Sequence, residues 1–330
     1  MTAPPGELHT LTNARGATAT ITPLGATLVE LRVPDRAGRL GNVVLGLDDP
    51  AAYAAQNFFL GAICGRVANR IRQARFTLAG VTYHLDANDP PHHLHGGSRG
   101  WYRVPWTVVA APSNGAALAL GYHSPEGESG YPGAVEARAV YTLTDDNQLR
   151  IEMSATTSHP TPINLTDHSY WNLAGTGTVL DHLLTLFSDA YTPGDPVVPT
   201  GAVASVEGTP FDHRVPRRVS PDLDHNFVVG RTPGVLRNVG RLFDPKSGRT
   251  MTVSSDQPGL QVYAGKFLDG STAGRGVTHV PHAGICLETQ AFPDAINVPE
   301  WRSQVLLHPG DTYRHTVIYA FSTDAARQTA

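Results

Sequence analysis

The chain has 330 residues, of which 41% are apolar and 16% charged, so it is long enough to bury a sizeable hydrophobic core. The 25 basic and 29 acidic side chains give a formal net charge of −4, which excludes a general nucleic-acid binder that works by neutralising phosphates. Because no run of about 18 apolar residues is present, we expect neither a spanning helix nor a membrane partner. The first residues do not resemble a secretory signal, and we therefore expect a cytoplasmic protein.

Short segments in which apolar and polar residues alternate follow one another along the chain and predict antiparallel strands. They lie at 17–23, 26–33, 76–85 with a turn at Gly80, 116–122, 134–143 and 149–155, with a hairpin turn at 145–147. Only 49–56 favours a helix, of two turns, with Asp48 or Asp49 as its N-cap. A doubly wound α/β fold needs long helices between its strands, so the pattern predicts an all-β sandwich or barrel.

The 33 glycines and 26 prolines are spread over the whole chain and mark no linker, so we expect one domain over 1–330. Cys64 and Cys286 are the only cysteines, which argues against a disulfide framework or a four-cysteine metal site and favours two buried thiols. Lys246 and Lys266 are the only lysines, so chemistry through a Schiff base has few candidates.

Two motifs near residue 95 suggest activities that their context does not support. GGSRG at 96–100 matches a nucleophile elbow, but Pro105 follows in a segment with no helical pattern. His93 and His95 are expected to share one face of an extended strand, close to His92, and this invites a metal hypothesis. No further ligand stands at a usual spacing, so we expect no metal.

Three segments combine polar and aromatic side chains in a way that suggests a sugar site. Arg66 and Arg70 lie four residues apart in an apolar stretch, and arginine is rarely buried without a partner. The sequence NLTDHSYWNL at 164–173 offers the flat rings of Tyr170 and Trp171 for stacking on a sugar and His168 for proton transfer. Glu288 stands in the strand-like ICLETQ, where burial would raise its pKa and make it a candidate general base.

These motifs, taken in order along the chain, resemble the aldose 1-epimerase (galactose mutarotase) family. The resemblance rests on GRVANRI (65–71), LHGG (94–97), NLTDHSYWNL (164–173), TPFDHR (209–214), DLDHNFVV (222–229), GLQVYAGKFLDG (259–270), ICLETQAFPDAINVPEW (285–301) and a PGDTYRHTVIYAFS ending. It implies a single-domain antiparallel β-sandwich of the galactose mutarotase-like supersandwich type. It also implies an isomerase that interconverts the α and β anomers of free aldohexoses such as galactose and glucose, without a cofactor and as a monomer or homodimer.

The resemblance further implies the roles of individual residues. Glu288 matches the catalytic base and His168 the catalytic acid. The sugar-binding positions are matched by Asn69, Arg70, His95, Asp224 and Gln261, and Ser169 and Tyr170 lie beside the acid as further substrate-binding candidates. The sequence departs from the commoner pattern at Asp167, Trp171 and 264–266, which leaves the preferred sugar open.

Ring opening needs an acid and a base in opposite protonation states, so we expect Glu288 to have the lower pKa and His168 the higher. Asp167 and Glu288 are candidates for raising the pKa of His168, although neighbours on a strand point to opposite faces, which counts against Asp167. Three alternatives stay open: a glycoside hydrolase using Glu288 with Asp224, a carbohydrate-binding protein without activity, and an epimerase of a pentose or a hexose 6-phosphate.

Overall fold

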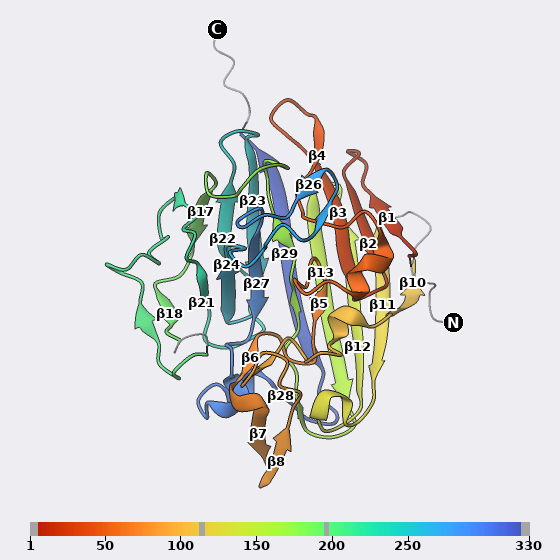
Figure 1. The fold of residues 1–330 in the computed structure, drawn as a ribbon, viewed down its shortest axis with the longest axis vertical. Helices are drawn as coiled ribbons and strands as arrows, with labels where there is room; N and C mark the ends of the chain where they lie inside the picture. Colours follow the sequence, from red (N-terminus) through yellow and green to blue (C-terminus); the bar gives the residue numbers. More distant parts are fainter. Residues whose placement is uncertain (1–5, 112–115, 195–197, 325–330) are drawn as a thin grey trace.

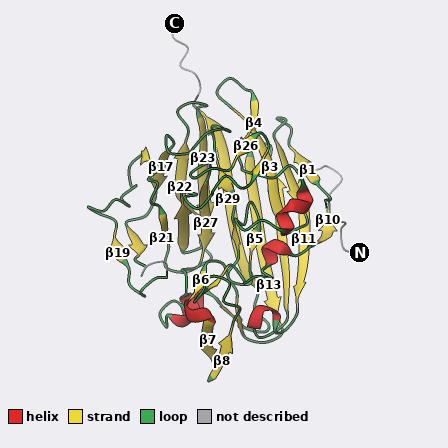
Figure 2. Cartoon of the chain, in the orientation of Figure 1, coloured by secondary structure: helices red, strands yellow, loops and turns green. Residues whose placement is uncertain are grey.

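The protein is built almost entirely from strands, joined by loops and short 3₁₀ helices (Figure 2). The computed structural model describes residues 6–111, 116–194 and 198–324. Its 3₁₀ helices are η1 (Pro50–Ala54), η2 (Arg72–Ala74), η3 (Trp101–Arg103), η4 (Glu128–Gly130), η5 (Ala295–Asn297) and η6 (Arg302–Gln304). Among the helices in these described residues, none has the length and hydropathy needed to cross a bilayer.

The largest element is a nine-stranded antiparallel sheet. Its strands are, in spatial order, β10 (Thr107–Ala110), β11 (Ala117–Ser124), β12 (Val135–Leu143), β13 (Gln148–Thr157), β29 (Tyr313–Thr323), β23 (Arg249–Ser255), β22 (Arg237–Phe243), β17 (Leu183–Leu186) and β20 (Arg217–Arg218). β29 joins the two halves of this sheet, because it pairs with β13 on one side and β23 on the other.

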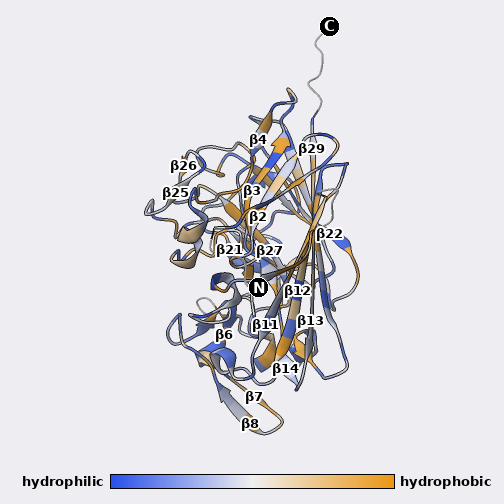
Figure 3. Ribbon diagram, turned by 90° about the vertical axis from the view of Figure 1, so that its right-hand side faces the viewer, coloured by the Kyte–Doolittle hydropathy of each residue, from blue (hydrophilic) through white to orange (hydrophobic). Residues whose placement is uncertain are grey.

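A six-stranded and a four-stranded sheet pack against one face of the large sheet. The first has the order β16 (Tyr170–Trp171), β27 (Ile285–Gln290), β24 (Gly259–Tyr263), β21 (Asp224–Val228), β18 (Ala190–Thr192) and β19 (Ala204–Ser205). The second has the order β1 (His9–Thr12), β2 (Thr18–Thr22), β3 (Thr27–Pro34) and β4 (Leu40–Asn42). Figure 3 shows β22 and β29 along one side of the molecule and β25 and β26 along the other, with β3 and β27 between them.

Five two-stranded ribbons complete the chain: β5 (Ile63–Cys64) with β15 (Thr166–Asp167), β6 (Arg70–Ile71) with β9 (His93–Leu94), β7 (Arg75–Leu78) with β8 (Val81–His84), β14 (Thr161–Pro162) with β28 (Leu306–Leu307), and β25 (Ala273–Gly274) with β26 (Val277–Thr278). The β7–β8 hairpin projects from one end of the molecule (Figure 1).

The core lies between the large sheet and the two smaller ones. One apolar cluster contains Ile151 and Tyr319 from the large sheet, Leu260 and Leu287 from the six-stranded sheet and Leu28 from the four-stranded sheet, all with at most 1% of their surface exposed. In β12, buried residues alternate with more exposed ones, as expected for a strand with one face on the core.

The all-β prediction is confirmed, and each predicted strand matches an observed strand or hairpin. Gly80 forms the β7–β8 turn at a φ of 80°, and Asn147 forms part of the β12–β13 turn at a φ of 62°. The predicted helix is the 3₁₀ helix η1, and its N-cap is Asp49, whose Oδ1 accepts a hydrogen bond from the backbone N–H of Ala51 at 2.9 Å.

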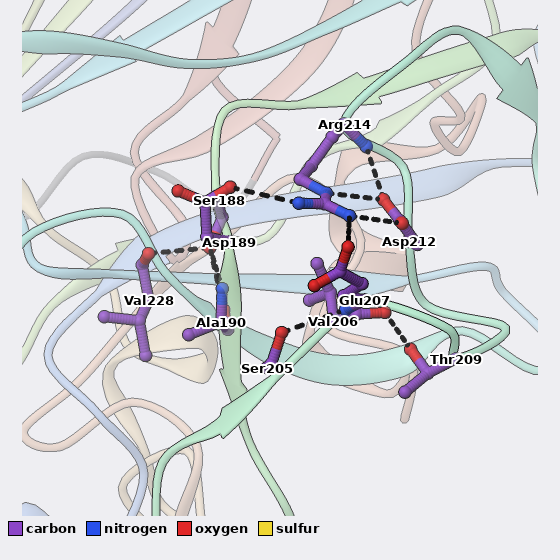
Figure 4. Close-up of polar contacts among 10 residues, drawn as sticks. All are labelled: Ser188, Asp189, Ala190, Ser205, Val206, Glu207, Thr209, Asp212, Arg214 and Val228. Carbon is purple, nitrogen blue, oxygen red and sulfur yellow. Dashed lines mark hydrogen bonds and ion pairs between the residues drawn. The ribbon is translucent and has the colours of Figure 1, made fainter.

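The TPFDHR motif ends in an arginine that holds together the loops around β18 and β19. Arg214 donates to both carboxylate oxygens of Asp212 and lies 3.7 Å from Asp189 and 3.9 Å from Glu207 (Figure 4). In the same region, Ser188 Oγ donates to the backbone O of Val228 at 2.7 Å. Since Val228 is the last residue of β21, this bond anchors the strand whose first residue is Asp224.

Candidate active site

A cavity of about 660 Å³ opens on the face of the six-stranded sheet that points away from the core. It collects residues from β6, β16, β21, β24 and β27, together with loops at 57–59 and 89–92. Seven of the side chains that line it are polar residues that the sequence assigns to acid–base chemistry or sugar binding: Asn69, Arg70, His95, His168, Asp224, Gln261 and Glu288.

The register of the sheet brings the polar residues of this cavity together. Along β27, Ile285 and Leu287 point into the apolar core, so Cys286 and Glu288 point to the opposite face. Directly opposite residues of an antiparallel pair share a face. Gln261 lies opposite Glu288, and Tyr263 stands opposite Cys286 on one side and Asp224 on the other. Three strands therefore supply one continuous polar surface.

His168 and Glu288 form a close pair at the bottom of this cavity. The Nε2 of His168 lies 3.6 Å from Oε1 of Glu288, and the two residues are only 3% and 2% exposed. The backbone of His168 is fixed on both sides, because its N–H donates to Ala62 O and its carbonyl accepts from the N–H of Gly61. Within the described residues, the Oε2 of Glu288 has no hydrogen-bond partner, which leaves it available to a ligand.

The electrostatics of this pair contradict the expected order of the two pKa values. Burial lowers the pKa of His168 to about 4. Burial also raises the pKa of Glu288 well above its ordinary value, with further contributions from Asp224 and Asp167 and an opposing one from Arg70. Burial thus favours the neutral forms of both groups, the imidazole of His168 and the protonated carboxyl of Glu288. Depth of burial, which sequence neighbours do not reveal, is the reason the expectation was wrong.

Asp167 is not the partner of His168. This agrees with the alternation of side chains along a strand, which counted against Asp167. Its carboxylate accepts hydrogen bonds from Ser169 Oγ and from the hydroxyl of Tyr319, each at 2.9 Å. Tyr319 belongs to β29 of the large sheet, so Asp167 points into the interior between the sheets. Burial raises the pKa of Asp167 to about 7, while these two hydrogen bonds oppose the rise.

Asn69 and His95 fix each other at the wall of the cavity. The backbone N–H of His95 donates to Asn69 O at 3.1 Å, and the backbone N–H of Asn69 donates to Nδ1 of His95 at 3.2 Å. Because Nδ1 accepts this bond, the ring proton of neutral His95 lies on Nε2, which can donate to a ligand. Burial, together with the nearby His168, keeps the pKa of His95 well below its ordinary value, so the ring stays neutral.

These histidines are poorly arranged for a metal. His95, His168 and Glu288 each bring one ligand atom within 4.8 Å of the others, the one group of three found in the part of the chain that the structure describes. A metal-binding histidine normally donates its second ring N–H to an acceptor. His95 accepts a hydrogen bond at that nitrogen, and Nδ1 of His168 meets the thiol of Cys286. The donor set therefore suits proton transfer and sugar hydroxyls better than a cation.

Arg70, Asp224 and Gln261 are held in place by their own polar contacts. The Nε of Arg70 donates to Asp89 Oδ2 at 2.7 Å, which leaves its terminal nitrogens for the cavity. Gln261 Nε2 donates to Asp224 Oδ1 at 2.9 Å. The ammonium of Lys266 lies 3.7 Å from Asp224 Oδ2, so a residue that departs from the commoner pattern sits beside a substrate-binding candidate.

Three expectations about individual residues are wrong. Ser169 does not line the cavity, because its hydroxyl donates to Asp167 in the interior. Trp171 offers no face to a sugar, since it is fully buried against Tyr319 with ring centroids 4.5 Å apart. His93 does not share a face with His95: its ring bonds to Asp86 O and to the hydroxyl of Tyr131, and His95 leaves the strand at a φ of 49°.

Two further motifs have structural roles. Ser98 of GGSRG donates to Asp86 Oδ2 at 2.5 Å, and only the three-residue η3 follows it, so the segment is no nucleophile elbow. Arg66 is 2% exposed and donates to the carbonyls of Pro132 and Gly133, which makes it a tie between loops.

Sequence reasoning missed a second group of ten residues around the cavity, four of which are phenylalanine or tyrosine. Phe59 packs against the rings of both His95 and His168, with centroids 4.6 and 5.4 Å apart. Asp89 orients Arg70, as described above. Two aromatic residues in a row at 58–59 and the DPPHH run at 89–93 were the signals in the sequence. The other missed lining residues are Asn57, Phe58, Pro90, Pro91, His92, Leu94, Tyr263 and Phe267.

The sequence and architecture of this chain are similar to those of named proteins. The family model described as aldose 1-epimerase matches residues 7–320. The chain is 43% identical to the galactose mutarotase of Rattus norvegicus over 310 residues, covering 90% of this chain and 89% of that one. It is 33% identical to the aldose 1-epimerase of Escherichia coli over 332 residues, covering 96% of this chain and 95% of that one.

Among solved structures, the GalM/aldose epimerase homologue from C. elegans superposes with a TM-score of 0.90 at 33% identity, covering 96% of this chain and 99% of that one. This agreement extends through both sheets and the strands that carry the cavity, because it spans nearly the whole of each chain. With the match of the family model, it confirms the fold and the family predicted from the motifs. The chain belongs to the aldose 1-epimerase family.

Proposed function

We propose that this chain is an aldose 1-epimerase that interconverts the α and β anomers of free aldohexoses, with His168 and Glu288 as its proton-transfer pair. The observation that carries the assignment is the 3.6 Å separation of these two groups at the bottom of a cavity lined with hydroxyl-binding side chains. The relatives named galactose mutarotase support galactose as the first sugar to test, and the resemblance of the motifs adds glucose as the second.

Ring opening requires two proton transfers at neighbouring oxygens of one sugar. Glu288 removes the proton of the C1 hydroxyl while His168 protonates the ring oxygen, and the bond between C1 and the ring oxygen breaks to give the open aldehyde. Rotation about C1–C2 presents the other face of the aldehyde, and the same transfers in reverse close the ring. No atom is oxidised and no group leaves the sugar, so two side chains suffice for the chemistry.

The pair enters this cycle with a single proton, and so no exchange with solvent is needed. Moving the proton from Glu288 to Nε2 of His168 gives the carboxylate and imidazolium that the first step uses. The arginine beside Glu288 lowers the pKa of this carboxyl and so favours the working form, as do the sugar hydroxyls that donate to Oε2. Either protonation form carries the same total charge, which limits the cost of switching inside a buried site.

The surrounding polar side chains hold the sugar so that both transfers stay short. Asn69, Arg70, His95, Asp224 and Gln261 offer donors and acceptors in the same cavity as the pair, and each is fixed by its own hydrogen bonds. Tyr170 lines the same cavity and packs against the ring of His168. We take these six as the substrate-binding residues.

The proposal includes the other expectations drawn from the sequence. One domain over 1–330 is supported by an apolar cluster that runs from Leu11 to Phe321. A cytoplasmic location is supported by two free, buried cysteines, which suit a reducing compartment. Whether the protein acts as a monomer or a homodimer is a question for sedimentation analysis of the purified chain.

Polarimetry tests the function directly. Freshly dissolved α-D-galactose and α-D-glucose are expected to reach their equilibrium rotations faster with the protein than without it. Methyl α-D-galactoside has no free anomeric hydroxyl, so its rotation is expected to stay constant, whereas a glycoside hydrolase would release galactose from it. Hexose 6-phosphates and a pentose in the same assay define the preferred sugar. Binding of sugar without faster mutarotation would show a carbohydrate-binding protein instead.

A further inference from the structure

A buried thiol lies directly behind the imidazole of His168. The Sγ of Cys286 is 3.5 Å from Nδ1 of His168, and Cys286 is fully buried. Cys286 lies two residues before Glu288 on β27, so both side chains point to the same face of the sheet. The cavity is lined by Glu288 but not by Cys286. One strand thus contacts both nitrogens of the imidazole, one through the carboxyl and one through the thiol.

Ring packing alone does not determine which nitrogen of His168 faces the cavity. The rings of Phe59, His95 and Tyr170 surround the imidazole at centroid distances of 5.4, 5.1 and 5.2 Å. Aromatic packing of this kind barely distinguishes a ring nitrogen from a ring carbon. A half-turn of the imidazole would exchange Nδ1 with Cδ2 and Nε2 with Cε1, and a carbon would then face Glu288.

We propose that Cys286 is a positioning residue for the epimerase reaction: its sulfur binds Nδ1–H of His168 and so directs Nε2, which takes up and releases the mobile proton, towards Glu288 and the sugar. This inference rests on the function proposed above. A thiol suits both states of the ring, because the sulfur accepts from Nδ1–H in the neutral imidazole and in the imidazolium.

The thiol also leaves the charge of the pair unchanged. Burial raises the pKa of Cys286 well above its ordinary value, so the side chain stays protonated and neutral. A carboxylate at this place would hold a proton on the imidazole permanently, as in a carboxylate–histidine pair. With a neutral partner at Nδ1, Glu288 is the nearest counter-charge, and the single proton remains free to move between the two catalytic groups.

The second cysteine provides a matched control. Cys64 is also fully buried and lies on the neighbouring β5–β15 ribbon, but it makes no hydrogen bond with His168 among those in the described residues. Cys286→Ala is expected to lower kcat about tenfold with KM within a factor of two. Cys286→Ser, which keeps a donor and acceptor, is expected to recover most of kcat, and Cys64→Ala is expected to stay within a factor of two of the wild type.

Nitrogen-15 NMR of the histidine rings tests the inference without relying on activity. In the wild type at pH 7, His168, assigned by comparison with His168→Asn, is expected to carry its proton on Nδ1, which leaves Nε2 free to accept the proton of Glu288. In Cys286→Ala, a mixture of Nε2–H and Nδ1–H forms is expected.

Unchanged tautomer and unchanged kcat in Cys286→Ala would overturn the positioning role and leave Cys286 as a packing residue. If Cys286→Ala does not fold, a wild-type spectrum with the proton on Nε2 overturns the inference by itself, and Cys286→Ser still supplies the kinetic comparison. Wild-type protein without mutarotase activity but with the Nδ1–H tautomer would overturn the proposed function and leave the contact between thiol and imidazole intact.

Discussion

The two faces of the six-stranded sheet are made by the same strands, yet one face packs in the apolar core and the other lines the polar cavity. On the core face, Leu260 and Leu287 meet the large sheet and are at most 1% exposed. On the cavity face, Gln261 and Glu288 are almost as buried, but one oxygen of the Glu288 carboxyl has no hydrogen-bond partner among the residues that the structure describes. The first face stabilises the fold and the second carries unsatisfied polar groups, which cost stability until a sugar binds. Burial alone therefore does not separate core from site; the polarity of the buried side chains does.

Substitutions at two neighbouring residues of β27 are expected to show the difference between the two faces most clearly. Glu288→Gln keeps the shape of the side chain and removes the base, so kcat is expected to fall about 10³-fold with little change in the melting temperature. Leu287→Ala is expected to cost about 2–5 kcal/mol of stability by opening a cavity, while the folded fraction keeps a normal kcat. Polarimetry and thermal unfolding on both variants provide the check. Glu288→Gln with activity within a few-fold of wild type rules out the assigned base.

The strand-like character of ICLETQ was visible in the sequence, and it placed Glu288 on a strand without showing which face the side chain takes. The alternation of side chains along a strand predicted that Asp167 and His168 point to opposite faces, and the hairpin at Gly80 followed from its turn residue. The sequence was insufficient wherever a distant segment decides the outcome. Phe59 and Asp89 enter the site because loops cross over the sheet, and the low pKa of His168 reflects burial by side chains from several elements. These differences between the sequence-based expectations and the structure arise from long-range packing, which no local sequence pattern encodes.

Arg70, at the edge of the cavity face, is expected to make both a structural contact and a contact with the sugar. Its Nε is used by Asp89, so binding a hydroxyl depends on the remaining nitrogens of the planar guanidinium. Arg70→Lys offers one ammonium for both contacts and is expected to raise KM and lower kcat, each about 5- to 20-fold. Steady-state polarimetry with the melting temperature as control gives the measurement. A protein that merely unfolds earlier, with normal kinetics when folded, would assign Arg70 to the scaffold.

The pH dependence of kcat/KM is expected to report the single proton shared by His168 and Glu288. Activity falls at low pH when the pair takes up a second proton. Because burial lowers the pKa of His168 to about 4, that limb is expected well below the ordinary histidine value of about 6.5. The upper limb marks loss of the last proton and is displaced upward by the raised pKa of Glu288. Initial rates, corrected for spontaneous mutarotation, should be flat from about pH 5 through neutrality. A lower limb near 6.5 contradicts this assignment.

Substitution of Asp167 is expected to have the smallest effect on catalysis. It tests the contribution of the interior side of the site to stability. Its carboxyl bonds Ser169 and Tyr319 in the interior, so Asp167→Asn is expected to leave both limbs of the kcat/KM profile within half a pH unit of the wild type. The folded-state pKa of about 7, raised from 3.8, means that the folded protein binds this proton more tightly than the unfolded chain does. The resulting stability is present below about pH 4 and is lost as pH rises towards 7, by up to roughly 4 kcal/mol at 1.36 kcal/mol per unit. Denaturant unfolding at pH 5 and pH 8 should therefore show a smaller loss of stability in Asp167→Asn than in the wild type. Equal losses in the two proteins, or a displaced limb in the variant, would mean that this carboxyl is ionised or coupled to His168 after all.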